Sequence, residues 1–248
     1  MTPSTQDPFT VSGISYPAGA VVDFQVDFKY SNGKDINWRE RLICPVTGLN
    51  NRLRASIHFA DFELGLKEYH SIYISEQVTP FYNYLKQKIP DITGSEFLGF
   101  DFPKGKANDK GIRHEDMTNL SFSDEQLDFY LSFECFEHIP DFNKSFEEAF
   151  RVLKQDGILF FTVPFIKQNP GNVIRAVINQ DGEVEHLLPP EYHGNPVSES
   201  GSLCYTHFGW EMLDQLRSCG FKDVYALTYW SDVFGYLGGE QILFFARK

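Results

Sequence analysis

The sequence predicts an α/β fold in which helices cover both faces of a seven-stranded, mostly parallel sheet. From residue 71 onward, short apolar stretches typical of strands alternate with stretches of helical periodicity. Residues 127–133 are apolar or aromatic at nearly every position, as expected of a strand that is buried on both faces. Alternation of this kind favours parallel strands that are joined by crossover helices.

Seven expected strands follow one another along this part of the chain. They span residues 71–75, 94–100, 111–114, 127–133, 158–163, 224–229 and 241–246. Helices are expected at 79–88, 143–153 and 208–218. Pro80 suits the first turn of the first helix, and Gly220 follows the end of the last. In such sheets, ligands bind at the carboxyl ends of the strands.

The chain divides into an N-terminal extension, residues 1–70, and one main domain, residues 71–248. The extension contains one expected strand within residues 20–28 and a helix near residues 52–66, and the rest is predicted to be an irregular arm. Its Cys44-Pro45-Val46-Thr47-Gly48 stretch resembles one knuckle of a zinc ribbon. A knuckle needs a second cysteine two residues on, where this chain has Thr47, so we expect a turn and no metal site.

The composition limits the partners and the compartment. With 22 Lys and Arg against 34 Asp and Glu, the net charge is −12, which disfavours a nucleic-acid substrate. Four scattered cysteines are expected to be free thiols. The polar start, residues 1–7, does not have the pattern of a signal peptide, and no apolar run reaches the length of a membrane span. We therefore expect a cytoplasmic protein without a membrane partner.

Two stretches resemble one enzyme family closely. Residues 111–141 read GIRHEDMTNLSFSDEQLDFYLSFECFEHIPD, and residues 149–157 read AFRVLKQDG. Together they resemble the class I S-adenosylmethionine (SAM)-dependent methyltransferases of the ubiquinone/menaquinone-biosynthesis-like group. The resemblance is strong over these stretches, extends plausibly over residues 71–248, and leaves residues 1–70 unexplained. It implies a Rossmann-like fold, a transferase activity and SAM as the cofactor.

The resemblance also implies a cofactor site at the strand ends. Glu76 would meet the amino group of SAM, and Glu96 would accept its ribose hydroxyls, although a surface carboxylate is the alternative for Glu96. Asp116 would accept from the adenine amino group, or else cap a turn. The other members of the predicted cofactor set are Phe97, Met117, whose side chain would face the ring, Phe133 and Glu134.

The first strand departs from the family pattern. The family has an acidic residue followed by Gly-x-Gly-x-Gly, because glycines let the backbone approach the cofactor. Residues 74–81, ISEQVTPF, contain no glycine. This leaves open an alternative, a catalytically silent methyltransferase-fold protein that acts as a binding or scaffold subunit. A nucleotide-dependent oxidoreductase is a weaker alternative, since its site depends on the same glycines.

The long insertion at residues 164–206 is predicted to cover the methyl acceptor, a small molecule or saccharide-like compound. It contains a β-hairpin around Asp181-Gly182 and a loop rich in Pro, Tyr and His. Imidazoles are natural general bases near neutral pH, so His193, His207 and His138 are the candidate catalytic residues. The candidate acceptor-binding residues are Arg175, Glu191 and Tyr192.

Overall fold

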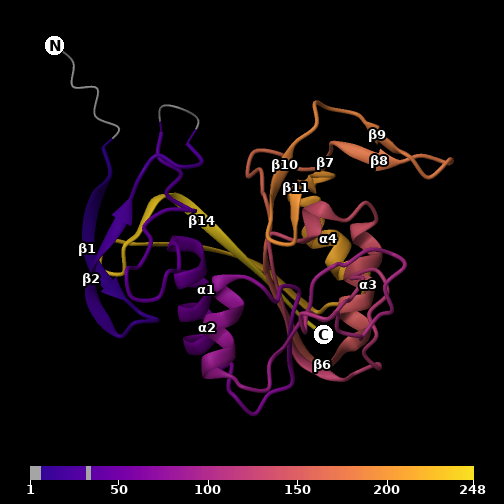
Figure 1. Ribbon diagram of the computed structural model, residues 1–248, viewed down its shortest axis with the longest axis horizontal. Coiled ribbons are helices and arrows are strands. Elements are labelled where there is room, and N and C mark those ends of the chain that lie inside the picture. Colours follow the sequence, from indigo (N-terminus) through magenta and orange to yellow (C-terminus); the bar gives the residue numbers. More distant parts are fainter. Residues whose placement is uncertain (1–6, 32–34) are drawn as a thin grey trace. The chain divides into compact units, whose positions relative to one another are not determined.

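The computed structural model describes residues 7–31 and 35–248, which form two compact units (Figure 1). One unit comprises Glu68–Ala226 and Phe244–Lys248, and the other Met1–Lys67 and Leu227–Leu243. The second unit therefore takes a segment near the C-terminus in addition to the predicted extension. Residues 1–6, where we expect no signal peptide, lie outside the described residues.

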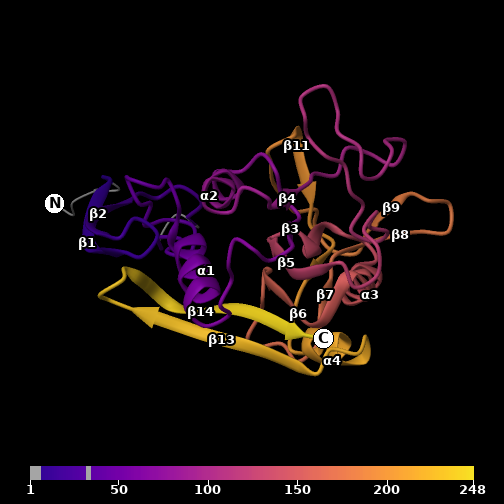
Figure 2. The ribbon, with the colours of Figure 1, turned by 90° about the horizontal axis from the view of Figure 1, so that it is seen from below.

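The central sheet has six strands in the described chain, in the order β13-β14-β6-β5-β3-β4 (Figure 2). Four of them are parallel neighbours, and β14 pairs with β6 in the antiparallel sense. The strands are β3 (Ile72–Ile74), β4 (Thr93–Gly94), β5 (Leu127–Phe133), β6 (Leu153–Thr162), β13 (Asp223–Ser231) and β14 (Tyr236–Arg247). With four α-helices in the described residues, this confirms the predicted mostly parallel α/β fold.

The seventh predicted strand, residues 111–114, is reduced to one parallel bridge between Glu96 and His114. Two other contacts explain why this segment does not form a full strand. Nδ1 of His114 accepts the backbone N–H of Leu98 at 2.9 Å, which removes that group from strand pairing. Arg113 forms an antiparallel bridge with Ala107. For the same reason, the strand predicted at 94–100 shrinks to β4.

Three helices belong to the unit that contains β3 to β6: α2 (Pro80–Lys88), α3 (Phe142–Val152) and α4 (Glu211–Ser218). Thr79 caps α2 by accepting the N–H of Tyr82 at 3.1 Å, and Asp141 caps α3. The buried face of α3 places Phe146 against Phe136 and Phe161, with ring centroids 5.0 and 6.4 Å away. Burying each ring of this kind stabilises the fold by about 1.5–3 kcal/mol.

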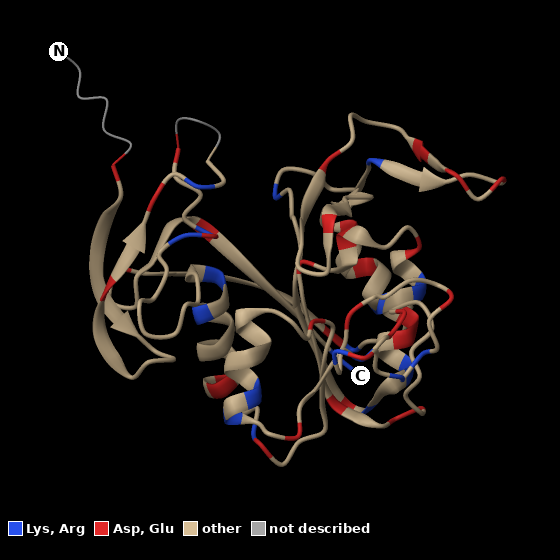
Figure 3. Ribbon diagram, in the orientation of Figure 1, with Lys and Arg blue, Asp and Glu red and all other residues tan. Residues whose placement is uncertain are grey.

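Charged residues of both signs are intermixed along the ribbon (Figure 3). On α3, Arg151 pairs with Glu148 at 2.7 Å and reaches Asp124 at 2.7 Å. At the opposite end of the strands from the predicted site, Asp128 accepts from Ser71 Oγ at 2.7 Å and from Lys154 Nζ at 2.9 Å. Asp128 therefore links the starts of β3, β5 and β6.

The insertion forms three small antiparallel pairs. β8 (Ala176–Ile178) pairs with β9 (Val184–His186), which confirms the hairpin predicted around Asp181-Gly182. β10 (Tyr192–Asn195) pairs with β11 (Ser198–Leu203), and β7 (Val173–Ile174) pairs with β12 (Thr206–His207). The backbone N–H of Tyr205 donates to the Glu137 carbonyl at 2.7 Å. The insertion is thus attached to the loop that follows β5.

The other unit contains a β-hairpin and a helix. β1 (Phe9–Ser15) pairs with β2 (Ala20–Val26), and α1 (Asn51–Phe62) follows. The prediction of an irregular arm before β2 was wrong, because Val11 of β1 packs against the core that contains Phe24 and supplies the contact that the strand needs. The predicted β2 and α1 are present.

The turn expected at Cys44 is confirmed, since the N–H of Gly48 donates to the Cys44 carbonyl at 2.8 Å. All four cysteines are free thiols. Among the described residues, the groups of side chains that could hold a metal ion do not include Cys44. No helix in the described ranges is long and apolar enough to cross a membrane.

Candidate functional site

The predicted cofactor residues gather at the carboxyl ends of parallel strands. Ile74 of β3 is in register with Gly94 of β4 and with Leu131 of β5, so the segments that follow these strands leave the sheet at one edge. Sγ of Cys135, after β5, donates to the carbonyl of Ser75, after β3, at 3.5 Å. This edge is where α/β sheets bind ligands.

Glu96 organises the glycine-free loop after β3. Its Oε1 accepts the backbone N–H of Gln77 at 2.7 Å and that of Val78 at 3.0 Å. Burial raises the pKa of Glu96 above its ordinary value, and these two bonds partly oppose the rise. The Gln77 side chain continues the network by donating to the Gly111 carbonyl and accepting the Arg113 N–H, at 2.9 and 2.7 Å. The side chains of Glu96 and Gln77 thus hold the loop after β3 in place, whereas the family pattern has glycines in this loop.

In the sequence, Glu76 directly precedes the residues of this network and Asp116 follows them. Glu76 is buried, and its charge raises the pKa of the Cys135 thiol further, after the effect of burial itself. Oδ1 of Asp116 accepts from the backbone N–H and the hydroxyl of Thr118, at 2.8 and 2.7 Å. Asp116 therefore caps a turn, which was the predicted alternative. Both bonds go to Oδ1, and Oδ2 takes part in neither of them.

The remaining predicted cofactor residues differ in exposure. Phe97 is 48% exposed and lies edge-on to Phe100, with ring centroids 5.0 Å apart. Met117 is half-buried. Phe133 is buried between Phe81 and Phe160, at 4.8 and 5.6 Å, so its ring belongs to the core.

Glu134 follows directly after β5 in the left-handed region, with φ of 58°. A non-glycine residue seldom adopts this conformation, and such residues occur often at functional sites. Its backbone N–H donates to the Thr162 carbonyl at 2.9 Å, which fixes the turn. The turn aims the following Cys135 and the Glu137-His138 pair away from the strand.

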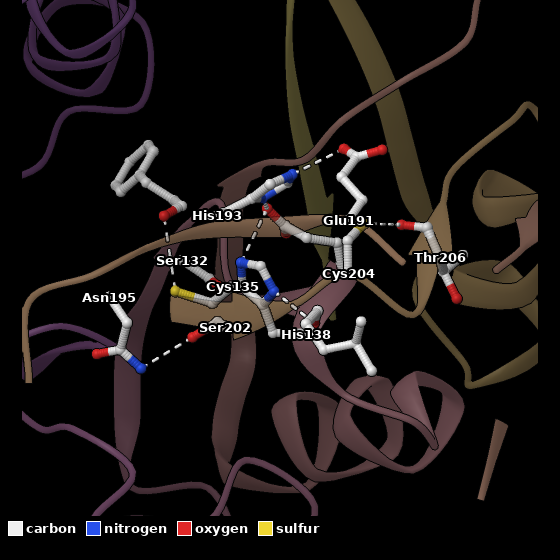
Figure 4. A network of polar contacts seen from close by, with 12 residues as sticks. Ser132, Cys135, His138, Glu191, His193, Asn195, Ser202, Cys204 and Thr206 are labelled. Carbon is white, nitrogen blue, oxygen red and sulfur yellow. Dashed lines mark hydrogen bonds and ion pairs between the residues drawn. The ribbon is translucent and has the colours of Figure 1, made fainter. Parts of the chain in front are cut away.

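Glu191 is the centre of the predicted acceptor side (Figure 4). Its Oε1 binds Nε2 of His193 at 2.9 Å and Nε2 of His207 at 3.1 Å, while its Oε2 pairs with Arg175 at 3.1 Å. Although burial acts to raise the pKa of Glu191, the bonds from His193 and His207 and the charges of His207 and Arg175 hold it below its ordinary value. The structure thus brings together four residues that the sequence nominated separately.

His138 comes from the loop after β5 and meets His193 from β10, with ring centroids 4.9 Å apart (Figure 4). Its Nδ1 lies 2.8 Å from the Leu203 carbonyl. Because a carbonyl can only accept, this nitrogen carries the proton, and Nε2 holds the lone pair. Burial lowers the pKa of His138 to about 4, so the imidazole is neutral at physiological pH.

Glu137 is the site residue that the sequence set did not include. Its side chain is fully buried, and neither carboxylate oxygen finds a hydrogen-bond donor among the described residues. Oε1 lies 3.6 Å from both His138 Nε2 and His193 Nδ1. Burial, followed by the charge of Glu134, raises the pKa of Glu137. The Glu-His pair after a buried strand was the signal that could have identified it.

The pKa of His193 is set by the carboxylates of Glu137 and Glu191. Glu137 first, and then Glu191, raise the pKa of His193, against the opposing effect of burial. In this arrangement His193 keeps its proton at neutral pH, which weakens it as a free general base. Arg175 is held by Glu191 and by the Pro189 carbonyl at 2.8 Å, and Tyr192 is 58% exposed beside them.

Residues 92–161 match the model of the methyltransferase domain family. This match supports the class I SAM-dependent methyltransferase that the sequence predicts. The matched stretch runs from the approach to β4 as far as β6, and it includes Glu96, Asp116, Glu137 and His138. The narrower ubiquinone/menaquinone-biosynthesis-like group stays a prediction.

Solved methyltransferase structures are also similar to this chain. An S-adenosylmethionine-dependent methyltransferase from Mesorhizobium loti is 14% identical, over 79% of this chain and 100% of that one, with a TM-score of 0.46. A 1,6-didemethyltoxoflavin-N1-methyltransferase from Burkholderia thailandensis is 16% identical, over 79% of this chain and 77% of that one, with a TM-score of 0.45. No curated protein matches the sequence.

Proposed function

We propose that this protein is an active SAM-dependent methyltransferase that transfers the methyl group to a small-molecule or saccharide-like acceptor. The observation that carries the proposal is the polar cluster of Glu191, His193 and His207, which lies against the loop after β5 at the cofactor edge of the sheet. A silent scaffold has no need of partly buried, mutually bonded imidazoles and a carboxylate beside a cofactor site.

The residues at the strand ends fit SAM. Glu96 binds the loop through Oε1 alone, so Oε2 is the proposed acceptor for the ribose hydroxyls. Glu76, buried after β3, is proposed to meet the amino group, and Asp116 with Met117 to bind the adenine. Phe97, which follows β4, has an exposed ring and is proposed to contact the cofactor as well. These roles follow from the residue types at successive strand ends.

On the acceptor side, the chain has to align a nucleophile and remove its proton. When bound, SAM supplies a methyl carbon that its sulfonium already activates. An acceptor hydroxyl oxygen would form a bond to that carbon while the carbon–sulfur bond breaks, with its electron pair remaining on sulfur and the hydroxyl proton passing to an imidazole. Arg175 and Tyr192 are proposed to contact the acceptor together with Glu191.

The proposed enzyme works in the cytoplasm on a soluble acceptor. Free thiols at four cysteines are typical of a reducing compartment, and the net charge of −12 does not favour a phosphate backbone as the substrate.

The test is a screen of hydroxylated, amino and carboxylated metabolites and sugars for release of S-adenosylhomocysteine. We expect at least one class of acceptor to give enzyme-dependent product. A protein that binds SAM and yields no product with any class would support the scaffold alternative instead.

A further inference from the structure

Three donor groups converge between the loop after β5 and strand β10. Glu137, His138 and His193 each offer one atom, and these atoms all lie within 4.8 Å of one another. Both imidazoles are 3.6 Å from Glu137 Oε1, which is longer than a hydrogen bond. Ligands on a tetrahedral ion with bonds of about 2.1 Å are roughly 3.4 Å apart. The spacing therefore fits three ligands around one shared ion.

The Glu137 carboxylate is suited to bind a cation. It is fully buried, and neither oxygen has a hydrogen-bond donor in the described part of the chain. Buried carboxylates are normally paired, hydrogen-bonded or bound to a metal, because an isolated buried charge is strongly destabilising. Without an ion, the protonated His193 at 3.6 Å is the charge that faces Glu137; a dication between Glu137 and the two imidazoles would displace that proton and bind the carboxylate directly.

Both imidazoles are oriented as metal ligands are. The Leu203 carbonyl fixes the proton of His138 on Nδ1, which leaves the lone pair of Nε2 facing Glu137. The Glu191 carboxylate accepts from Nε2 of His193, so Nδ1 faces Glu137 and becomes a ligand when the incoming ion displaces its proton. Ligating histidines almost always donate their other N–H to a carbonyl or a carboxylate, since this sets the tautomer and the ring angle.

We propose that Glu137, His138 and His193 bind one divalent transition-metal ion, for which Zn²⁺ is the reference case. Two imidazoles and one carboxylate suit Zn²⁺ and its first-row neighbours, whereas Mg²⁺ and Ca²⁺ take oxygen ligands. Three protein ligands leave a position open, as in catalytic zinc sites. The sequence predicted no metal here, because His193 lies far along the chain from the Glu137-His138 pair.

The neighbouring trio of Glu191, Cys204 and His207 also groups donor atoms within 4.8 Å. It is the weaker candidate, because Glu191 is already bonded to His193, His207 and Arg175. These bonds suit Glu191 better as a support for the ligand His193.

The role of the ion rests on the proposed function, whereas its binding does not. An acceptor hydroxyl in the open position would become more acidic on the ion, which favours the deprotonated oxygen that attacks the methyl group. With His138 and His193 occupied as ligands, His207 is the imidazole left to take the hydroxyl proton. This assigns different tasks to the three histidines of the site.

Binding is tested on the full chain without a histidine tag, stripped with a chelator. Titration with Zn²⁺ by calorimetry, and with Co²⁺ by visible absorption, should show one ion per chain. Glu137→Gln, His138→Ala and His193→Ala should each weaken binding by at least about 100-fold, and Glu191→Gln by about 10–100-fold. His186→Ala, an exposed histidine of β9, is the matched control and should bind as the wild type does.

Glu137→Gln guards against loss of folding, because it keeps the shape of the side chain and removes the buried charge. It should melt at or above the temperature of the metal-free wild type and gain nothing from added Zn²⁺. Absence of binding to the wild type, or wild-type affinity in both Glu137→Gln and His138→Ala, would overturn the site. A SAM titration of the same samples separates the two ideas: Zn²⁺ binding without SAM binding would contradict the proposed function alone.

Discussion

Oε1 of Glu96 accepts the backbone N–H of Gln77 at 2.7 Å. The contact explains how the loop after β3 keeps its shape without the family's glycines, since the same oxygen also binds the N–H of Val78 at 3.0 Å. Neither bond uses Oε2, which is the oxygen proposed to bind the ribose hydroxyls. Glu96 thereby combines loop support with the predicted ribose contact.

Glu96→Ala should weaken SAM binding more than it weakens binding of an analogue that lacks the ribose hydroxyls. Both ligands lose the loop support, but only SAM loses the hydroxyl contact, and a bond to a charged group is worth about 1.5–3 kcal/mol. Calorimetry with the two ligands measures the difference. Glu96→Gln, which keeps an acceptor for the N–H of Gln77, is the control. If Glu96→Ala weakens the binding of both ligands equally, Glu96 does not contact the ribose.

Asp116→Ala should weaken SAM binding by roughly 1–3 kcal/mol, because the adenine amino group loses its partner. Since Asp116 also caps a turn with Thr118, Thr118→Val is the matched variant: it removes the hydroxyl donor and keeps the carboxylate. Affinity for SAM and melting temperature are measured for both. If the Asp116→Ala protein folds and binds SAM with unchanged affinity, Asp116 caps the turn and does not contact the cofactor.

His193→Ala should leave SAM affinity nearly intact and lower turnover by about 100-fold or more, because the carboxylates that His193 contacts, Glu191 and Glu137, lie on the acceptor side and neither is a predicted cofactor residue. Kinetics with an acceptor found in the screen measure this, with His186→Ala as the control. Full turnover by the His193→Ala enzyme would exclude His193 from the chemistry. A purely structural His193 would instead lower the melting temperature and disturb the binding of both ligands.

Asp128→Asn should destabilise the protein at neutral pH and flatten the acid side of its stability profile. Burial acts to raise the pKa of Asp128, but the bonds from Ser71 and the charge of Lys154 outweigh it and hold the pKa below the ordinary value. A carboxyl whose pKa is lower in the folded state stabilises it above the unfolded value of about 3.9 and loses this effect as the pH falls through the folded pKa. Denaturant unfolding from pH 7 to pH 3 should show wild type and variant converging at the acid end; a constant gap would contradict this linkage.

Arg54→Ala should be among the most destabilising changes in the unit that contains α1. The guanidinium is fully buried, stacks 3.7 Å over the Phe24 ring and donates to the carbonyls of Phe234 and Gly235 at 2.8 and 2.9 Å. Its loss leaves two buried acceptors and a cavity, for which we expect about 3–5 kcal/mol. Arg39→Ala, on a partly exposed arginine of the same unit, should cost about 1 kcal/mol or less in the same denaturant unfolding experiment.

Local patterns gave the elements that are strongly periodic or wholly apolar. β5 begins and ends where its apolar run predicts, and the hairpin around Asp181-Gly182 follows from its turn residues. β1 escaped prediction because its seven residues are stabilised by pairing with β2 and by a core that joins Phe24 of β2 to Leu42, farther along the chain. The strand at 111–114 failed because the His114 side chain competes for a backbone N–H.

The site shows the same division. The sequence nominated His138, Glu191 and His193 separately, but their grouping depends on the β10–β11 hairpin folding against the loop after β5, a contact between distant segments. Glu137 was passed over because its importance lies in its burial and its unpaired oxygens, which spacing along the chain does not reveal. Arg175 was nominated for the acceptor and is held by Glu191 in the structure.

Calorimetric titration of the purified chain with SAM and with S-adenosylhomocysteine is the most direct measurement of the central claim. A methyltransferase should bind both ligands at one site per chain, and each should compete with the other. Binding that falls in Glu96→Ala and persists in His193→Ala is the expected result. Absence of binding for both ligands in the folded wild type would contradict the claim that this chain uses SAM.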